Sequence, residues 1–215
     1  MKYKAVIFDL DGVICDTDQH HYWAWKQIAA ELGVYFDEDI NNRLRGISRR
    51  KSLDIILESY PAELNEAKKE YYTSKKNDLY RSLLKNMSPK DLSPEVKKTM
   101  DRLKSHGVLL AIGSSSKNAK FILKQLCLED YFDAVSDGTN IIRSKPDPEV
   151  FMKASKFLNI KPQSCLVVED SKSGILAALA ANMDCAAINN GTRYNLAHYN
   201  LQNFSDLLLI VLNAD

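Results

Sequence analysis

Residues 5–12 read Ala-Val-Ile-Phe-Asp-Leu-Asp-Gly, a short apolar run that ends in two carboxylates and a glycine. Two further apolar runs of this form occupy residues 108–112 and 166–168. Short apolar runs bounded by polar residues are typical of strands that are buried on both faces of a parallel sheet. Helical patterns follow these two runs, over residues 117–128 and 173–182. The alternation predicts an α/β fold, a doubly wound (Rossmann-like) parallel sheet.

A long helical stretch separates the first two predicted strands. Apolar residues recur there at helical spacing in three stripes, of which the first stops at Gly33 and the second at Pro61. Both residue types commonly end helices. A crossover of this length far exceeds what a βα connection needs. We therefore predict an α-helical cap domain, residues 16–88, inserted into a catalytic core made of residues 1–15 and 89–215.

The composition excludes several classes of protein. The chain has 215 residues, with 29 Lys and Arg against 28 Asp and Glu and a net charge of +1. This balance disfavours a nucleic-acid binder, which usually has a basic excess. The 4 cysteines form no Cys-x-x-Cys pair, so free thiols in a reducing compartment are favoured over a zinc site or a disulfide framework. No apolar run approaches a membrane span or a signal-peptide core. We expect a cytoplasmic monomer without nucleic-acid or membrane partners, although no sequence pattern reports on association.

Carboxylates follow the first and third predicted strands. Because parallel sheets bind ligands at the carboxyl ends of their strands, Asp9 and Asp11 should share a crevice with Glu169 and Asp170. Side chains two residues apart in extended backbone point to the same side, so both aspartates can face one pocket. Four carboxylates in one crevice repel each other unless a cation intervenes, and oxygen ligands beside a phosphate favour Mg²⁺. The sequence predicts one Mg²⁺ ion in this site.

Groups that suit an anion follow the second predicted strand. Residues 113–118 read Gly-Ser-Ser-Ser-Lys-Asn and precede a predicted helix, where hydroxyls, backbone N–H groups and a helix N-terminus can together bind an anion. Lys145 precedes another predicted helix and adds a positive charge. Each feature alone is common in turns and helix caps. Their succession at neighbouring strand ends favours phosphoryl transfer, in which catalysis is mainly positioning and charge neutralisation.

Four motifs together resemble the haloacid-dehalogenase-like hydrolase superfamily: residues 8–14, 113–116, 145–146 and 169–171. Their order and spacing are similar to its β-phosphoglucomutase-like branch. The resemblance implies that Asp9 is the nucleophile, which becomes an aspartyl phosphate, and that Asp11 is the general acid and base. It implies that Ser114 and Lys145 complete the catalytic set. The implied metal ligands are Asp9, the backbone carbonyl of Asp11, Glu169 and Asp170.

A basic cluster in the predicted cap consists of Arg43, Arg45, Arg49, Arg50 and Lys51. Short charge runs are usually solvated helix flanks. This run, however, resembles a cap motif of the same branch, in which a glycine lets the sugar approach the backbone and an arginine grips the distal phosphate. Arg49 is the matching arginine, and a guanidinium fork suits that task.

The same resemblance implies a substrate-binding set that extends over cap and core. The spacing from Thr17 selects His21 over His20, and His21 would couple cap closure to the orientation of Asp11. His21 and Trp25 are four residues apart and share one helix face. The implied substrate-binding residues are Thr17, His21, Trp25, Leu44, Gly46, Ile47, Ser48, Arg49, Ser52, Lys76, Ser115, Ser116, Lys117 and Asn118.

The implied activity is a magnesium-dependent phosphotransfer on a small phosphorylated sugar. It would interconvert β-D-glucose 1-phosphate and glucose 6-phosphate through glucose 1,6-bisphosphate. One alternative is a magnesium-dependent phosphatase of small sugar phosphates with the same core. Another is a receiver-type signalling domain, which also combines clustered acids with a lysine but is disfavoured by the inserted helices and Asp11. Residues after Asn189 predict a final strand or helix pair without identifiable chemistry.

Overall fold

The structure, a computed structural model, describes residues 1–212. Its centre is a parallel sheet with the strand order β3-β2-β1-β4-β5-β6. The strands are β1 (Ala5–Phe8), β2 (Leu109–Gly113), β3 (Ala134–Ser136), β4 (Cys165–Glu169), β5 (Asp184–Ala187) and β6 (Tyr199–Asn200). The three predicted strands are β1, β2 and β4, with β1 in the middle. The predicted doubly wound parallel sheet is confirmed.

The pairing register places the ends of the strands that carry the predicted site residues at the same level. Phe8 of β1 is paired with Ile112 of β2 and with Val168 of β4. The residues that follow Phe8 and Val168, Asp9 and Glu169, therefore lie level at the carboxyl edge of the sheet. Local apolar runs form these strands, and their register brings the carboxylates together.

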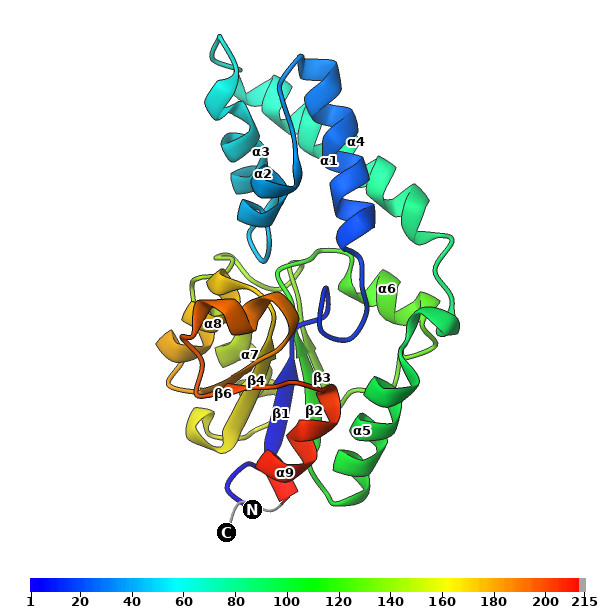
Figure 1. Cartoon of the computed structure of the whole chain (residues 1–215), viewed down its shortest axis with the longest axis vertical. Coiled ribbons are helices and arrows are strands. Elements are labelled where there is room, and N and C mark those ends of the chain that lie inside the picture. The colour runs from blue at the N-terminus through cyan, green and yellow to red at the C-terminus, as the bar shows by residue number, and fades with distance from the viewer. Residues whose placement is uncertain (213–215) are drawn as a thin grey trace.

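Helices cover both faces of the sheet (Figure 1). The helices within the described residues are α1 (Asp18–Leu32), α2 (Glu38–Arg43), α3 (Arg49–Ile56), α4 (Glu66–Leu84), α5 (Pro94–Ser105), α6 (Ala119–Gln125), α7 (Glu149–Phe157), α8 (Lys172–Ala180) and α9 (Leu207–Leu212). Helices α5, α6 and α9 pack on one face of the sheet, and α7 and α8 pack on the other. Successive residues of β1 point to opposite faces and so enter both clusters.

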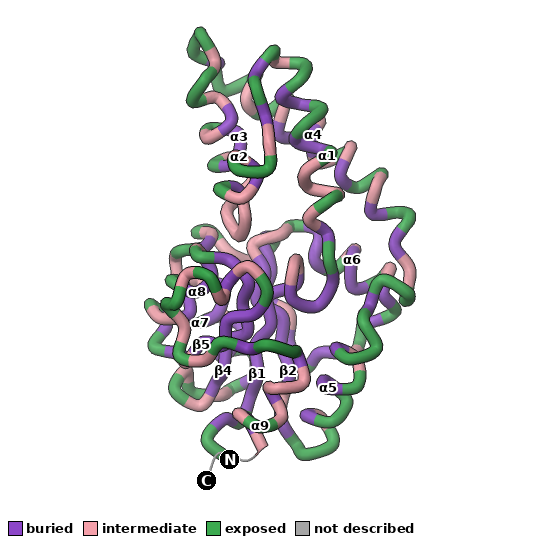
Figure 2. Tube along the Cα trace, viewed as in Figure 1, coloured by how far each residue is buried: buried purple, intermediate pink, exposed green. Residues whose placement is uncertain are grey.

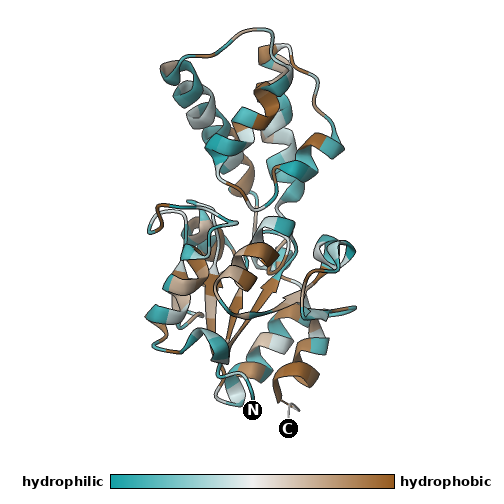
Figure 3. Cartoon of the chain, turned by 90° about the vertical axis from the view of Figure 1, so that its left-hand side faces the viewer, coloured by the Kyte–Doolittle hydropathy of each residue, from teal (hydrophilic) through white to brown (hydrophobic). Residues whose placement is uncertain are grey.

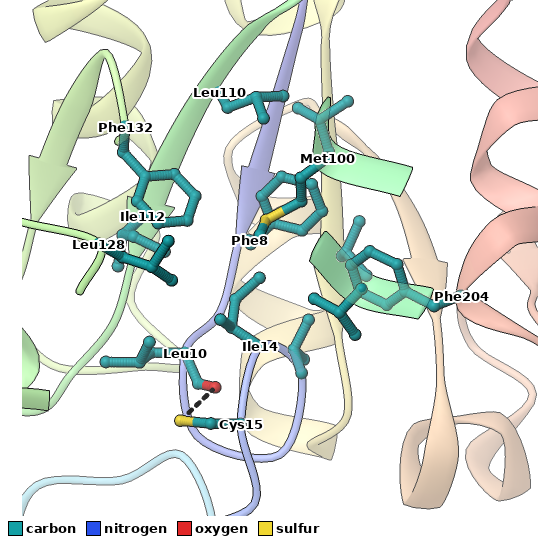
Figure 4. Packing of buried hydrophobic residues seen from close by; sticks show 14 of the residues in the cluster. Phe8, Leu10, Ile14, Cys15, Met100, Leu110, Ile112, Leu128, Phe132 and Phe204 are labelled. Atoms are coloured by element: carbon teal, nitrogen blue, oxygen red, sulfur yellow. Dashed lines mark hydrogen bonds between the residues drawn. The ribbon is translucent and has the colours of Figure 1, made fainter. Parts of the chain in front are cut away.

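The larger cluster shows how the core is held together (Figure 4). Phe8 is fully buried, and its ring stacks on that of Phe204 with centroids 5.7 Å apart. Burying a side chain of this size contributes about 1.5–3 kcal/mol. The Sγ atom of Cys15 donates to the carbonyl oxygen of Leu10 at 3.9 Å, within the turn that follows β1. In Figure 3 the strands are coloured as hydrophobic, in agreement with a sheet covered on both sides.

Helices α1–α4 lie at one end of the molecule, beyond the carboxyl edge of the sheet (Figure 1). We call these helices and the loops between them the helical cap. They share a hydrophobic cluster of their own, to which α1 contributes Trp25 and Ile28 and α3 contributes Leu53 and Ile56. Helix α1 ends at Gly33, as predicted, in the left-handed conformation (φ 68°) that glycine adopts without strain. Buried and exposed residues alternate along these helices, which shows that each has one packed face (Figure 2).

The end of the described chain contains the short strand β6 and helix α9, which packs against α5. None of the helices in residues 1–212 combines the length and the apolar character needed to cross a membrane. All 4 cysteines are free thiols, and Cys127 is the exposed one among them.

Candidate active site

A cavity of about 920 Å³ lies between the carboxyl edge of the sheet and the helical cap. Most of the predicted site residues line it: Asp9, Asp11, His21, Trp25, Leu44, Gly46, Ile47, Ser48, Arg49, Ser52, Lys76, Ser114, Ser115, Ser116, Lys117, Asn118 and Asp170. Thr17, Lys145 and Glu169 do not line it, because they are buried directly behind its wall. The fold therefore brings residues from motifs that are far apart in the sequence into one cavity.

Lys145 forms the base of this site. It is fully buried, and its Nζ atom is 2.5 Å from Asp9 Oδ1 and also donates to Glu169 Oε1. Burial raises the pKa of Asp9 to about 7, although the nearby ammonium of Lys145 acts in the opposite direction. Burial alone lowers the pKa of Lys145, but the two carboxylates raise it above its ordinary value. Lys145 is thus held as a cation beside the predicted nucleophile.

Three carboxylates converge at this point. Oxygen atoms of Asp9, Glu169 and Asp170 lie within 4.8 Å of one another. Burial and the charges of Glu169 and Asp9 raise the pKa of Asp170 well above its usual range, so another cation would stabilise its ionised form. An all-oxygen donor set suits a hard metal ion. The residues present therefore fit a metal ion at the carboxyl end of β1 and β4.

The carboxylate of Asp11 does not belong to this group of oxygens. Its Oδ1 atom accepts a hydrogen bond from Thr17 Oγ1 and another, 3.2 Å long, from the hydroxyl of Tyr80. Burial raises the pKa of Asp11, while these hydrogen bonds act to lower it. The position leaves the Asp11 carboxylate available for proton transfer rather than for metal binding.

The half-buried His21 and the buried Lys76 form a pair on the cap side of Asp11. Lys76 Nζ is 2.7 Å from His21 Nδ1, and His21 Nε2 is 3.9 Å from Asp11 Oδ1. Burial and the charge of Lys76 lower the pKa of His21 well below its ordinary value, and burial and the charge of Arg49 lower that of Lys76. In the tautomer in which Lys76 donates to Nδ1, neutral His21 carries its proton on Nε2, the atom that faces Asp11.

The basic cluster of the cap is mostly neutralised. Arg43 pairs with Glu58, Arg50 with Glu66, and Arg45 with Asp18 and Asp170. Within residues 1–212, Arg49 is the arginine of this cluster that has no carboxylate partner, and it donates to Asn77 Oδ1 at 2.8 Å. Arg49, the arginine that the motif selects, is therefore available to an anionic ligand in the cavity.

Asn77 connects the helical cap to the core beside the cavity. Its Oδ1 atom accepts from Arg49 of α3 and from Asn118 Nδ2, 2.9 Å away, at the start of α6. The serine-rich turn before α6 is itself ordered by its hydroxyls, because Ser116 N donates to Ser114 Oγ and Asn118 N donates to Ser116 Oγ, both at 3.1 Å. The predicted anion-binding turn does precede a helix.

Gly46 lies where the cap touches the core. A Cβ atom at this position would be 2.5 Å from the hydroxyls of Ser171 and Ser173, and the φ of 72° also favours glycine. Ser173 Oγ donates to the carbonyl oxygen of Arg45 at 3.0 Å. The sequence reasoning explained this glycine by the approach of a sugar, and the structure adds a close approach to the start of α8.

Sequence reasoning missed Tyr80 and did not assign contacts to Asp18 or Arg45. Tyr80 is 1% exposed and stacks on His21 with ring centroids 4.1 Å apart. One signal was available, since Tyr80 lies four residues after Lys76 and so occupies the same helix face. The ion pair of Arg45 with Asp170 joins residues 125 positions apart, and no sequence pattern indicates it.

The fold and the site define a class of protein. The family model described as "Haloacid dehalogenase-like hydrolase" matches residues 6–188. The chain belongs to this family, which confirms the resemblance of its motifs and disfavours a receiver-type signalling domain. It is similar to the β-phosphoglucomutase of Bacillus subtilis, with 39% identity over 214 residues that cover 99% of this chain and 95% of the relative.

Two further comparisons are informative. The solved structure of a β-phosphoglucomutase from Clostridium difficile superposes with a TM-score of 0.91 and 35% identity, covering 98% of this chain and 96% of that chain. A phosphorylated carbohydrates phosphatase of Thermotoga maritima is 34% identical over 185 residues, which cover 84% of this chain and 82% of the relative. The similarity to the mutases thus extends over nearly the whole chain.

Proposed function

We propose that this chain is a β-phosphoglucomutase that interconverts β-D-glucose 1-phosphate and glucose 6-phosphate through glucose 1,6-bisphosphate. The observation that carries the proposal is the placement of cationic groups at both ends of one cavity. Arg49 lines the cavity on the cap side, and Lys145 lies buried behind the core wall, against Asp9, which lines the cavity. Such a cavity suits a substrate with two phosphates. The full-length similarity to the Bacillus subtilis mutase supports this choice over a phosphatase.

We also propose the identity of the metal ion, the bounds of the two domains, the partner and the location of the protein. Mg²⁺ suits the three carboxylates because it prefers oxygen ligands and accompanies phosphate. Residues 16–88 would be the cap domain, and residues 1–15 and 89–215 the catalytic core. The separate hydrophobic cluster of the cap supports this division. The partner would be a small phosphorylated sugar, and the protein would be a cytoplasmic monomer.

In the first half-reaction, Asp9 attacks a phosphorus atom of the bisphosphate. The new bond joins Asp9 to phosphorus, the bond from phosphorus to the sugar oxygen breaks, and Asp11 gives its proton to that oxygen. Lys145 offsets the negative charge of Asp9 as it approaches the phosphate. A bound Mg²⁺ would supply further neutralisation of the phosphoryl oxygens.

In the second half-reaction, the 6-hydroxyl of β-D-glucose 1-phosphate attacks the aspartyl phosphate. Its oxygen binds phosphorus, the bond from phosphorus to Asp9 breaks, and glucose 1,6-bisphosphate forms again. Asp11 takes the proton of that hydroxyl, and Asp9 is released. The bisphosphate then turns around and presents its other phosphate to Asp9. Water must be excluded while the aspartyl phosphate is present, because attack by water would only release phosphate. Two contacts hold the cap against the core and so help to keep water out: that of Asn77 with Asn118 and that of Arg45 with Asp170.

The proposal is tested with purified protein, β-glucose 1-phosphate, Mg²⁺ and a trace of glucose 1,6-bisphosphate, followed by ³¹P NMR. We expect glucose 6-phosphate to accumulate without stoichiometric inorganic phosphate. An Asp9→Asn variant is the matched control and should be inactive, because it lacks the nucleophile. Release of inorganic phosphate without glucose 6-phosphate would identify a sugar phosphatase and overturn the proposal.

A further inference from the structure

Glu149 is the first residue of α7 and lies outside the cavity wall. Its carboxylate accepts hydrogen bonds from the backbone N–H of Ile142, 3.1 Å from each oxygen, and from that of Arg143 at 2.8 Å. Lys153, one helical turn later, pairs with the same carboxylate at 2.9 Å. The side chain of Glu149 therefore ties the loop before α7 to the helix.

This tie anchors the loop together with two other contacts, the ion pair of Arg143 with Asp147 at 3.2 Å and the hydrogen bond from Lys153 Nζ to the carbonyl oxygen of Asn140. The side chain of Ile142 is 92% exposed and that of Arg143 is 71% exposed, so neither is held by packing. Two backbone N–H groups and an ammonium converge on Glu149, and a carboxylate can accept from all of them at once. No neutral side chain of similar size offers the same acceptor capacity.

The loop that Glu149 holds carries the buried lysine of the active site. Lys145 follows Arg143 by two residues, and its backbone N–H donates to Ser115 Oγ at 3.4 Å. Helix α7 also supports the tip of the lysine, because the ring centroid of Phe151 is 4.7 Å from Lys145 Nζ. The first turn of α7 thus restrains Lys145 at both ends, through Glu149 on the backbone and Phe151 on the ammonium.

We propose that Glu149 is a positioning residue for phosphoryl transfer: it holds the loop of residues 138–148 so that Lys145 Nζ stays between Asp9 and Glu169. The inference deepens the proposed function and rests on the phosphoryl-transfer chemistry of that site. It places a determinant of kcat outside the cavity. Small displacements of a catalytic group can cost about 10²-fold in rate, so loss of this anchor is expected to be measurable.

The test compares Glu149→Ala and Glu149→Gln with wild type, using β-glucose 1-phosphate and the general ester p-nitrophenyl phosphate. We expect Glu149→Ala to lower kcat on both substrates by roughly tenfold to 10²-fold while KM changes by less than about twofold, because Glu149 does not touch the cavity. Glu149→Gln keeps one acceptor oxygen and should lose less. Amide hydrogen exchange should become faster in residues 138–148 of the alanine variant.

Glu95 provides the matched control. It also lies in the first turn of a helix, α5, and accepts a backbone N–H, that of Ser205 at 2.9 Å, away from the cavity. Glu95→Ala should leave kcat and the exchange of residues 138–148 unchanged.

Unchanged kcat in Glu149→Ala with faster exchange in the loop would overturn the inference, as would a loss of kcat without faster exchange. If Glu149→Ala does not fold, Glu149→Gln is decisive, and wild-type kcat in that variant would reject the role. Failure of the mutase proposal is recognised separately, because wild type would then hydrolyse p-nitrophenyl phosphate without forming glucose 6-phosphate. The comparison of variants on the aryl ester would still decide the role of Glu149.

Discussion

The hydroxyl of Tyr80, on helix α4 of the cap, donates a hydrogen bond of 3.2 Å to Asp11 Oδ1, on the turn that follows β1. The two residues are 69 positions apart, and they connect the cap to the predicted acid and base of the core. The orientation of Asp11 therefore depends on where the cap lies.

Tyr80→Phe should lower kcat by roughly tenfold to 10²-fold, because a hydrogen bond to a charged group contributes about 1.5–3 kcal/mol. KM should change little, since Thr17 still holds Asp11 near its place. Steady-state kinetics with β-glucose 1-phosphate provide the measurement. Tyr71→Phe is the control on the same helix, because Tyr71 is exposed, lies outside the cavity and has its hydroxyl near the half-buried Lys75. Equal rates for the two variants would contradict the role of Tyr80.

Asp11→Asn should retain phosphate binding but lose kcat by about 10²–10⁴, the usual contribution of general acid–base catalysis. The amide cannot take up or give the proton, although it fills the same space. Binding is measured by calorimetry with inorganic phosphate, and turnover with β-glucose 1-phosphate. Turnover close to that of wild type would refute the assignment of proton transfer to Asp11.

Arg49→Ala should weaken binding of glucose 1,6-bisphosphate by about 10²-fold, since a charge-assisted contact of roughly 2–3 kcal/mol is lost. Hydrolysis of p-nitrophenyl phosphate, which has no second phosphate, should fall much less. Arg43→Ala is the control, because Arg43 pairs with Glu58 on the exposed side of the cap. A uniform loss across both substrates would count against a role of Arg49 at the distal phosphate.

Mg²⁺ should raise the melting temperature of the wild-type protein and should fail to do so in Asp170→Asn. An ion that binds the folded state at 100 times its Kd stabilises it by about 2.7 kcal/mol, which corresponds to several degrees. Differential scanning fluorimetry with and without Mg²⁺ measures the shift, and a chelator should abolish both the shift and turnover. An equal shift in both proteins would place the ion outside the carboxylate group of Asp9, Glu169 and Asp170.

The fifth prediction concerns stability and pH at the opposite end of the sheet. Asp184 accepts hydrogen bonds from Lys2 at 2.6 Å and from Tyr3 at 2.5 Å. Burial alone raises the pKa of Asp184, but these two partners lower it overall below its ordinary value. A lowered pKa in the folded state means that the stabilisation is present above the unfolded pKa of about 3.9 and is lost as the pH falls through the folded value.

Asp184→Asn should therefore reduce the free energy of unfolding by about 1 kcal/mol near neutral pH, after allowance for the partial exposure of the pair. The difference from wild type should remain above about pH 5 and shrink as the pH falls below about 4. Urea denaturation at several pH values measures it. A difference that grows on acidification would contradict the assigned sign.

The sequence predicted the parts of the fold that depend on local patterns. The apolar runs of β1, β2 and β4 are continuous and end in polar residues, so their strands and their functional ends were recognisable. Helix α1 was predicted together with its end at Gly33, because glycine adopts the left-handed conformation without strain. Strands β3 and β5 were not predicted, since they depend on the pairing partners that stabilise them. Strand β6 lies in the segment after Asn189, where a final strand or helix pair was expected.

The candidate site was likewise predicted where it depends on local motifs and not where it depends on contacts in space. Motif spacing indicated Asp9, Asp11, Lys145 and Glu169, because parallel strand ends necessarily meet at one edge of a sheet. Arg49 was also selected from the basic cluster by its motif, but the neutralisation of Arg43, Arg45 and Arg50 could not be predicted, because it depends on which carboxylates lie opposite in space.

The sequence alone determined that a parallel sheet brings carboxylates, hydroxyls and a lysine to one edge, since each strand carries its own apolar run and polar end. Only the tertiary structure decided that Tyr80 orients Asp11, that Arg49 is left without a carboxylate partner, and that Glu149 anchors the loop of Lys145. These contacts join different elements of the fold. Their geometry is set by how helices pack against strands and loops, and local residue patterns do not contain that information.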